Sequence, residues 1–343
     1  MTNQLLAVKN LRISFHTYAG EVQAVRGVSF KVNEGECMAI VGESGSGKTV
    51  TSKAVLGLIE PPSGEVKADS SINFAGQEVL KFTDRQWRNY RGKDAAMIFQ
   101  DPMTSLNPTM KIGRQIMENI LLHNKLSRQE ARERTLELLR MVNIPNPEER
   151  INQYPYEFSG GMRQRVVIAI ALACKPRLMI ADEPTTALDV TIQAQILQLL
   201  RNIQKQEHTA VIMITHDLGV VAGMADYISV MYAGRIVEQG TVAEIFSHPQ
   251  HPYTSALLKA VPSLNQENKA RLQIIPGTPP DMIAPPQGCG FASRCQYCMK
   301  VCQHRDPAYT SFSDTHQAAC WLHDDLAKAA FDYQDVSEVL NHA

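Results

Sequence analysis

The chain has 343 residues, 44% of them apolar, and 34 Lys and Arg residues nearly balance 35 Asp and Glu residues, for a formal net charge of −1. This near-neutral balance offers no broad positive field for nucleic acid, and the longest apolar run, 166–174, is shorter than the about 18 residues that a membrane-spanning helix requires. The N-terminus lacks an export-signal pattern, so we expect a cytosolic globular protein of two or three domains.

The first fifty residues predict strands that open an α/β domain. Short apolar runs separated by turn signals lie at 5–15, 25–32 and 37–41, and each is typical of a β-strand. Directly after the third run, VGESGSGKT at 41–49 matches the full phosphate-loop pattern GxxxxGK[ST], and a helical pattern follows it. This context favours a nucleotide site over a glycine-rich turn that merely connects two elements.

The chemistry of the loop explains its residue types. Backbone N–H groups can turn toward phosphates only where no Cβ obstructs them, and the start of a helix adds a favourable dipole. Lys48 can reach the β- and γ-phosphates, and the Thr49 hydroxyl can bind Mg²⁺. The predicted nucleotide-binding residues of the loop are Gly42, Ser44, Gly45, Ser46, Gly47, Lys48, Thr49 and Val50.

A helical segment follows. Residues 113–126 and 127–142 have the spacing of amphipathic helices, and Ser127 with Glu130 forms a capping box at the start of the second helix. We therefore predict a small helical subdomain over 106–160.

From residue 162 the chain returns to an alternation of strands and helices. Strands are predicted at 178–181 and 210–214, with a helix at 191–204 between them, and this order predicts a mostly parallel sheet covered by helices. Asp182 and Glu183 follow the first of these strands, where ligands collect on open α/β sheets. We expect Asp182 to hold Mg²⁺ and Glu183 to polarise the attacking water, although such a pair taken alone is more often a solvated turn.

Further motifs give the chain a family resemblance. EFSGGMRQR at 157–165, Gln100 after a predicted strand, ALD at 187–189 and His216 follow the phosphate loop in a fixed order, and with them the chain resembles the ATP-binding cassette family of transport ATPases over 5–240. The resemblance implies an α/β P-loop NTPase cassette, a mostly parallel sheet with an antiparallel β portion. Its ATPase core would comprise 1–105 and 161–246, and the helical subdomain would end at the signature.

The resemblance also implies residue roles. Tyr18 resembles the aromatic residue that stacks on adenine, with Phe15 as the alternative. Gln100 resembles the glutamine that senses the γ-phosphate and Mg²⁺, and His216 the switch histidine that holds the γ-phosphate. Asp189 resembles an aspartate at the contact between two cassettes. The residues implied in catalysis are Lys48, Gln100, Glu183 and His216, and those implied in Mg²⁺ binding are Thr49, Gln100 and Asp182.

In this family the signature binds the nucleotide of a partner. Ser159, Gly160 and Gly161 would open a helix whose N–H groups face the γ-phosphate held by a second cassette, so ATP joins two cassettes. Met162 stands where the family usually has Gln, and we expect this change to leave activity intact but to make the two sites of a pair unequal.

Five stretches and the late cysteines narrow the resemblance to the ATP-binding subunits of bacterial oligopeptide and dipeptide permeases, the oligopeptide member above all. The stretches are 97–108, 181–197, 214–222, 230–238 and 248–262. The implied function is ATP hydrolysis that powers peptide uptake at the cytoplasmic face of the membrane. The implied partners are two transmembrane permease subunits, a second and homologous ATP-binding subunit, and an extracytoplasmic peptide-binding protein. Import of nickel or another small solute is the alternative. A nucleic-acid or ribosome-associated cassette protein is disfavoured by the single phosphate loop.

A C-terminal extension, 247–343, contains a cysteine-rich stretch at 285–322 and an expected helix over 323–340. The family spacing of four cysteines recurs and implies a [4Fe-4S] cluster, while the thiols alone also suit zinc or no metal at all. Cys298 is extra and is an alternative ligand. A proline-rich tail of under about 80 residues would use such a metal as a staple. The four cysteines are Cys289, Cys295, Cys302 and Cys320.

Overall fold

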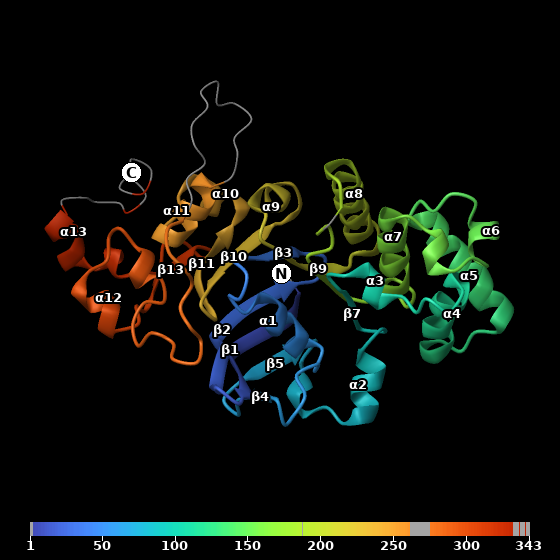
Figure 1. The fold of residues 1–343 in the computed structure, drawn as a ribbon, viewed down its shortest axis with the longest axis horizontal. Coiled ribbons are helices and arrows are strands. Elements are labelled where there is room, and N and C mark those ends of the chain that lie inside the picture. The colour runs from blue at the N-terminus through green and yellow to red at the C-terminus, as the bar shows by residue number, and fades with distance from the viewer. Residues whose placement is uncertain (1–2, 187, 261–274, 332–335, 337–339, 341–343) are drawn as a thin grey trace, which may run out of the picture. The chain divides into compact units, whose positions relative to one another are not determined.

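The computed structural model describes residues 3–186, 188–260, 275–331, 336 and 340 (Figure 1). The chain divides into two compact units. The first comprises Met1–Leu5, Val32–Cys37 and Phe74–Ile214, and the second Leu6–Lys31, Met38–Asn73 and Thr215–Ala343. Within the described ranges, no helix combines the length and the apolar character that crossing a bilayer demands.

The first unit contains a parallel sheet of β7 (Ala95–Ile98), β8 (Leu178–Asp182) and β9 (Ala210–Thr215). All residues of these strands are buried, because continuous runs of apolar residues suit strands that are covered on both faces. Helix α8 (Val190–Glu207) buries an apolar stripe that includes Ile196 and Leu200. The predicted strands and helix of this region are therefore confirmed. The unit's remaining elements before β7 are β6 (Gln77–Glu78), the 3₁₀ turn η1 (Val79–Lys81) and α2 (Asp84–Tyr90).

A group of helices separates β7 from β8 in the sequence. α4 packs against α5 and α7, and Figure 1 shows α4, α5 and α6 grouped beside α7. The predicted capping box is present, since Ser127 Oγ accepts a hydrogen bond from Glu130 N and Glu130 Oε2 accepts one from Ser127 N. The bounds are α3 (Pro102–Ser105), α4 (Ile112–His123), α5 (Arg128–Met141), α6 (Pro147–Arg150), η2 (Pro155–Glu157) and α7 (Gly160–Ala171).

The second unit contains antiparallel strands that the N-terminal part of the chain supplies. β1 (Gln4–Thr17) lies between β2 (Gly20–Asn33) and β5 (Ser71–Phe74), and β4 (Gly64–Val66) also pairs with β1. The predicted strands at 5–15 and 25–32 are thus extended by a few residues at their ends.

Another sheet of this unit is mixed. β3 (Cys37–Val41) runs parallel to β10 (Tyr227–Tyr232), whereas the following strands are antiparallel in the order β10, β11, β13, β12. Their bounds are β11 (Arg235–Thr241), β12 (Tyr309–Ser311) and β13 (Gln317–Ala319). The helices of the unit are α1 (Lys48–Val55), α9 (Leu218–Met224), α10 (Val242–Ser247), α11 (Pro252–Lys259), α12 (Lys300–His304) and α13 (Asp325–Phe331), with 3₁₀ turns η3 (Ala292–Arg294) and η4 (Trp321–His323).

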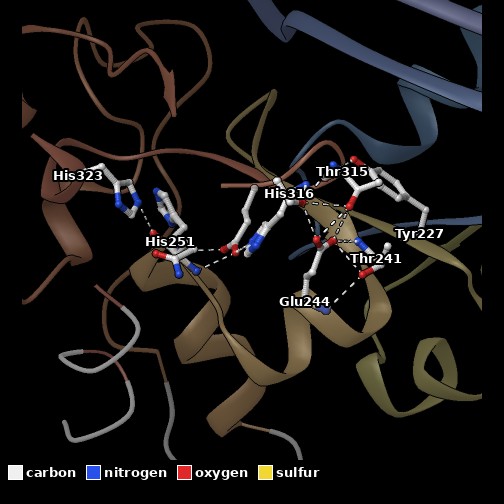
Figure 2. A network of polar contacts seen from close by, with 10 residues as sticks. Tyr227, Thr241, Glu244, His251, Thr315, His316 and His323 are labelled. Atoms are coloured by element: carbon white, nitrogen blue, oxygen red, sulfur yellow. Dashed lines mark hydrogen bonds and ion pairs between the residues drawn. The ribbon is translucent and has the colours of Figure 1, made fainter. Parts of the chain in front are cut away.

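Polar contacts, buried at β11 and exposed at α10, attach residues 313–316 to these two elements (Figure 2). The fully buried Glu238 carboxylate lies 2.8 Å from His316 Nε2 and accepts hydrogen bonds from the backbone N–H groups of Gln250 and His251. Glu244 accepts hydrogen bonds from Ser313 and Thr315.

Apolar contacts add to this attachment. Phe291 is buried against Tyr232 and Tyr253. Side-chain packing therefore holds this part of the cysteine-rich stretch in place without a bound metal. Of the helix expected over 323–340, α13 accounts for Asp325–Phe331, and residues 332–335 and 337–339 lie outside the described residues.

Candidate nucleotide-binding site

The phosphate loop joins β3 to α1, as its pattern predicts. Two glycines are required by close backbone contacts, because a Cβ on Gly42 would lie 2.1 Å from Met231 O and one on Gly47 would lie 2.4 Å from Ala24 O. Gly47 also has a φ of +98° at the N-cap of α1, in the left-handed region that favours glycine. The loop therefore keeps a compact turn directly in front of a helix N-terminus, where N–H groups can bind an anion.

Lys48 lies within this turn. Its ammonium donates hydrogen bonds of 2.8 Å to the carbonyl oxygens of Gly42 and Glu43, and its side chain is buried. Ser46 Oγ is buried and has no hydrogen-bond partner among the described residues. A buried hydroxyl in this position fits a loop that completes its hydrogen bonds with phosphate oxygens.

The acidic pair lies in the first unit, at the carboxyl end of β8. Asp182 is buried, and Glu183 has a φ of +46° and donates its backbone N–H to Ile214 O. Glu183 Oε2 accepts hydrogen bonds of 2.9 Å from Gln100 Nε2 and from Thr186 Oγ1. Because β7 and β8 are parallel neighbours, their carboxyl ends meet at one edge of the sheet, and the structure thereby brings together Gln100 and Glu183.

The sequence does not mark Thr186 as a residue of the site. The only local signal is a hydroxyl three residues after the predicted catalytic carboxylate, and turns commonly contain such a residue for reasons unrelated to catalysis. Its hydrogen bond to Glu183 becomes visible only in the folded turn.

The signature residues open α7. Ser159 is the N-cap and its Oγ accepts a hydrogen bond from Met162 N, and Gly160 and Gly161 are the first residues of the helix. A Cβ on Gly161 would lie 2.7 Å from the Ile192 side chain, so this position favours glycine for packing as well. A 12-residue helix with an exposed N-cap can bind an anion through its first N–H groups.

Three other predicted residues lie on turns. Asp189 caps α8 by accepting a hydrogen bond from Ile192 N, and Ala187 of the same motif lies outside the described residues. His216 directly follows β9. Tyr18 is fully exposed in the turn between β1 and β2, whereas the alternative Phe15 is half-buried. The roles of these residues remain predictions.

Four of the five late cysteines share one small cavity. Burial raises the pKa of Cys289 to about 11 and that of Cys295 to about 12, so both thiols stay protonated at neutral pH unless a cation compensates. Yet in the part of the chain that the structure describes, no three or more His, Cys, Asp or Glu side chains are close enough to hold one metal ion. The described residues therefore do not support the predicted cysteine-rich metal module. The cavity is lined by Cys289, Cys295, Cys302 and Cys320 together with His251, and Cys298 is not among its lining residues.

Comparisons with protein families match two parts of the chain. Residues 25–186 match the family described as ABC transporter, and residues 237–302 match the family described as oligopeptide/dipeptide transporter, C-terminal region. The second match begins in β11 and ends at Cys302.

Curated relatives cover nearly the whole chain. The oligopeptide transport ATP-binding protein of Bacillus subtilis is 57% identical over 326 residues, which cover 95% of this chain and 91% of the relative. The dipeptide transport ATP-binding protein of the same organism is 54% identical over 327 residues, 95% of this chain and 97% of the relative.

Solved structures match the cassette part. A dimeric ATP-binding cassette in a post-hydrolysis state bound to ADP and Pi aligns with a TM-score of 0.62 at 26% identity, covering 69% of this chain and 99% of the other. Together with the family match, this likeness identifies the fold as the P-loop NTPase fold of an ABC cassette, with mixed sheets and helices.

Proposed function

This chain belongs to the family of ATP-binding proteins of oligopeptide and dipeptide ABC transporters, and we propose that it hydrolyses ATP to power the uptake of oligopeptides or dipeptides through separate membrane subunits. The observation that carries the proposal is the identity of more than half of the residues over 95% of the chain to an oligopeptide transport ATP-binding protein. The phosphate loop with Lys48 held in its turn supports the ATPase activity.

The loop would bind the triphosphate. The ammonium of Lys48 would transfer from the loop carbonyls to phosphate oxygens, and Ser46 Oγ would gain a partner. Thr49, Gln100 and Asp182 are the residues that would hold Mg²⁺, which when bound neutralises charge on the β- and γ-phosphates. An oxygen donor set of this kind suits Mg²⁺.

Glu183 would orient and polarise the attacking water. Its carboxylate accepts hydrogen bonds from Gln100 and Thr186, so its orientation is fixed by two donors before a water approaches. His216 would hold the γ-phosphate, and Tyr18 would stack on the adenine.

A second cassette would complete each site. The exposed N-cap Ser159 and the following Gly160 and Gly161 would bind the γ-phosphate on the partner, with Asp189 at the contact. The dimeric form of the solved cassette supports this arrangement, and we propose a homologous but distinct chain as the second cassette.

The membrane subunits would dock on the helical subdomain, for which we propose the bounds 106–160. Leu122 and Tyr156 are 77% and 67% exposed there, and Met103 directly before it is 60% exposed. These apolar side chains would be covered by the permease subunits in the assembled transporter. The chain would thus lie at the cytoplasmic face of the membrane, with two permease subunits and an extracytoplasmic peptide-binding protein completing the transporter.

The late cysteines would hold a [4Fe-4S] cluster, with Zn²⁺ as the alternative. One feature of the cavity supports a bound group: His251 Nε2 is buried there without a hydrogen-bond partner among the described residues. A cluster separates its thiolate ligands, whereas a zinc ion draws four of them to about 2.3 Å from one point. The proposed cluster rests on the family spacing of the four cysteines and on the cavity that they share.

Reconstitution of this chain with candidate permease subunits and a second cassette tests the transport proposal. We expect peptide uptake into vesicles that requires ATP and that fails with Glu183→Gln. Uptake that continues with Glu183→Gln, or ATP turnover that no oligopeptide or dipeptide accompanies, would contradict it. Nickel uptake in the same vesicles would support the alternative solute.

A further inference from the structure

Arg294 forms a two-point ion pair with the phosphate loop. Its Nη1 donates to Glu43 Oε2 at 2.7 Å and its Nη2 donates to Glu43 Oε1 at 3.1 Å. Both residues belong to the second unit and are separated by 251 positions in the sequence. Such a fork-to-carboxylate geometry fixes orientation as well as distance, which a lysine could not do.

The guanidinium is itself held rigidly. The Arg294 side chain is only 4% exposed, and it also donates hydrogen bonds to Tyr232 OH, Ile275 O and Pro276 O. Burial opposes the charge, but the bonds to Glu43 and Tyr232 outweigh it and raise the pKa of Arg294. Arg294 is therefore a fixed cation beside the loop.

Glu43 passes this restraint to the phosphate-binding residues. Its backbone N–H donates to Tyr253 OH at 2.9 Å, and its carbonyl accepts a hydrogen bond from Lys48 Nζ at 2.8 Å. One loop residue thus contacts Arg294, Tyr253 and the predicted phosphate-binding lysine. A free carboxylate at this position would repel a triphosphate, and Arg294 neutralises it.

The position of Arg294 depends on the cysteine-containing segment. Arg294 ends the 3₁₀ turn Ala292–Arg294 between Cys289 and Cys295, and backbone hydrogen bonds link Ala292 N to Cys289 O and Cys295 N to Ala292 O. The turn that carries the two cysteines therefore also sets the direction of the guanidinium.

We propose that Arg294 is a positioning residue of the nucleotide site, which holds the phosphate loop through Glu43 in its triphosphate-binding conformation. ATP affinity then depends on the integrity of the turn 289–295. This role rests on ATP binding at the phosphate loop and does not require that the cysteines hold a metal.

Calorimetric titration of the full chain with MgATP tests the role. Arg294→Met leaves the Glu43 carboxylate without its cation, and we expect the Kd to rise about tenfold or more, since an unpaired charge in a partly buried site is costly. In turnover assays, KM should rise while kcat stays within about twofold, because the reacting groups are untouched. Arg305→Met, at an exposed position of the same segment, is the matched control and should bind as the unmodified chain does.

A double variant separates positioning from neutralisation of charge. Adding Glu43→Gln to Arg294→Met removes the uncompensated charge but does not restore the anchor of the loop, so most of the lost affinity should stay lost while thermal unfolding stays normal. Unchanged MgATP affinity of Arg294→Met would overturn the proposal, as would full recovery in the double variant, which would show that Arg294 only neutralises Glu43. Absence of MgATP binding by the unmodified chain would refute the nucleotide site itself, and this role with it.

Discussion

Gln100 Nε2 donates a hydrogen bond of 2.9 Å to Glu183 Oε2, and so joins the carboxyl ends of two parallel strands through their functional side chains. Thr186 Oγ1 donates to the same oxygen. The carboxylate that is proposed to polarise water is therefore oriented by two donors, one from the next strand and one from its own turn.

Replacement of this carboxylate should stop turnover without preventing binding. Glu183→Gln keeps the size of the side chain and one acceptor oxygen but removes the base, and we expect ATP turnover to fall by roughly 10² or more. MgATP binding measured by calorimetry should be retained. Glu149→Gln, at an exposed position of α6, is the control, and full turnover by Glu183→Gln would remove Glu183 from this role.

Loss of the second donor should have a smaller effect. Thr186→Val removes the hydroxyl but keeps the shape, and a hydrogen bond to a charged group contributes about 1.5–3 kcal/mol, part of which serves orientation. We expect kcat to fall several-fold with an unchanged Kd for MgATP. Thr186→Ser should restore kcat, and a Thr186→Val variant as active as the unmodified chain would show that Gln100 alone is sufficient.

Two glycines of the phosphate loop provide a matched pair of variants. Gly47→Ala would place a Cβ 2.4 Å from Ala24 O, whereas Gly45→Ala has nothing within 4 Å of its Cβ. Both have positive φ values and share the modest cost of left-handed backbone, about 1 kcal/mol. We therefore expect Gly47→Ala to lose thermal stability as well as MgATP binding, and Gly45→Ala to keep most of its thermal stability while MgATP binding weakens, because Gly45 belongs to the predicted phosphate-binding loop. Equal losses of thermal stability in the two variants would mean that backbone strain, and not contact, decides.

The sequence predicted the elements that are locally encoded. Continuous apolar runs such as 178–181 and 210–214 became β8 and β9, because a short apolar run between turn residues is a local signal of a buried strand. The strands β12 and β13 have three residues each and were missed, since so short a segment has no recognisable period.

Contacts between distant residues had no local signal. Gln100 and Glu183 are 83 positions apart, and only the family resemblance suggested that they act together. Nothing in the sequence marked Arg294 as a partner of Glu43, because an arginine between two cysteines is usually a solvated surface residue. The family spacing of the cysteines implied a [4Fe-4S] cluster. Four of the thiols line one cavity, but the described residues contain no group of side chains able to hold a metal ion, so the cluster stays a proposal.

The cavity makes a prediction about the cysteines. Protein purified without oxygen should be brown and contain close to four iron and four sulfide per chain if the cluster is present. Cys320→Ser should lose the colour, whereas Cys298→Ser should keep it, because Cys320 lines the cavity and Cys298 does not. Colourless protein with one zinc per chain would support the alternative, and retention of iron by Cys320→Ser would contradict the ligand set.

The hydrogen bonds of Glu244 predict that the chain loses stability as the pH falls. Burial opposes the charge of this carboxylate, but hydrogen bonds from Ser313, Thr241 and Thr315 outweigh it and lower its pKa from 4.5 to about 2. As pH falls, the unfolded chain thus binds a proton before the folded chain does, and the stabilisation that exists above pH 4.5 is lost progressively toward pH 2.

Thermal unfolding of the full chain across pH 7 to 3, compared with that of Glu244→Gln, measures this contribution. The unmodified chain should be the more stable at neutral pH, and the difference should shrink below pH 4.5 because the unfolded chain then gains stability by binding a proton at Glu244 while the folded chain does not. Glu149→Gln, whose carboxylate is exposed, should differ little from the unmodified chain at any of these pH values. A Glu244→Gln difference that stays constant from neutral to acidic pH would show that packing, and not the charge of Glu244, joins α10 to the turn 313–316.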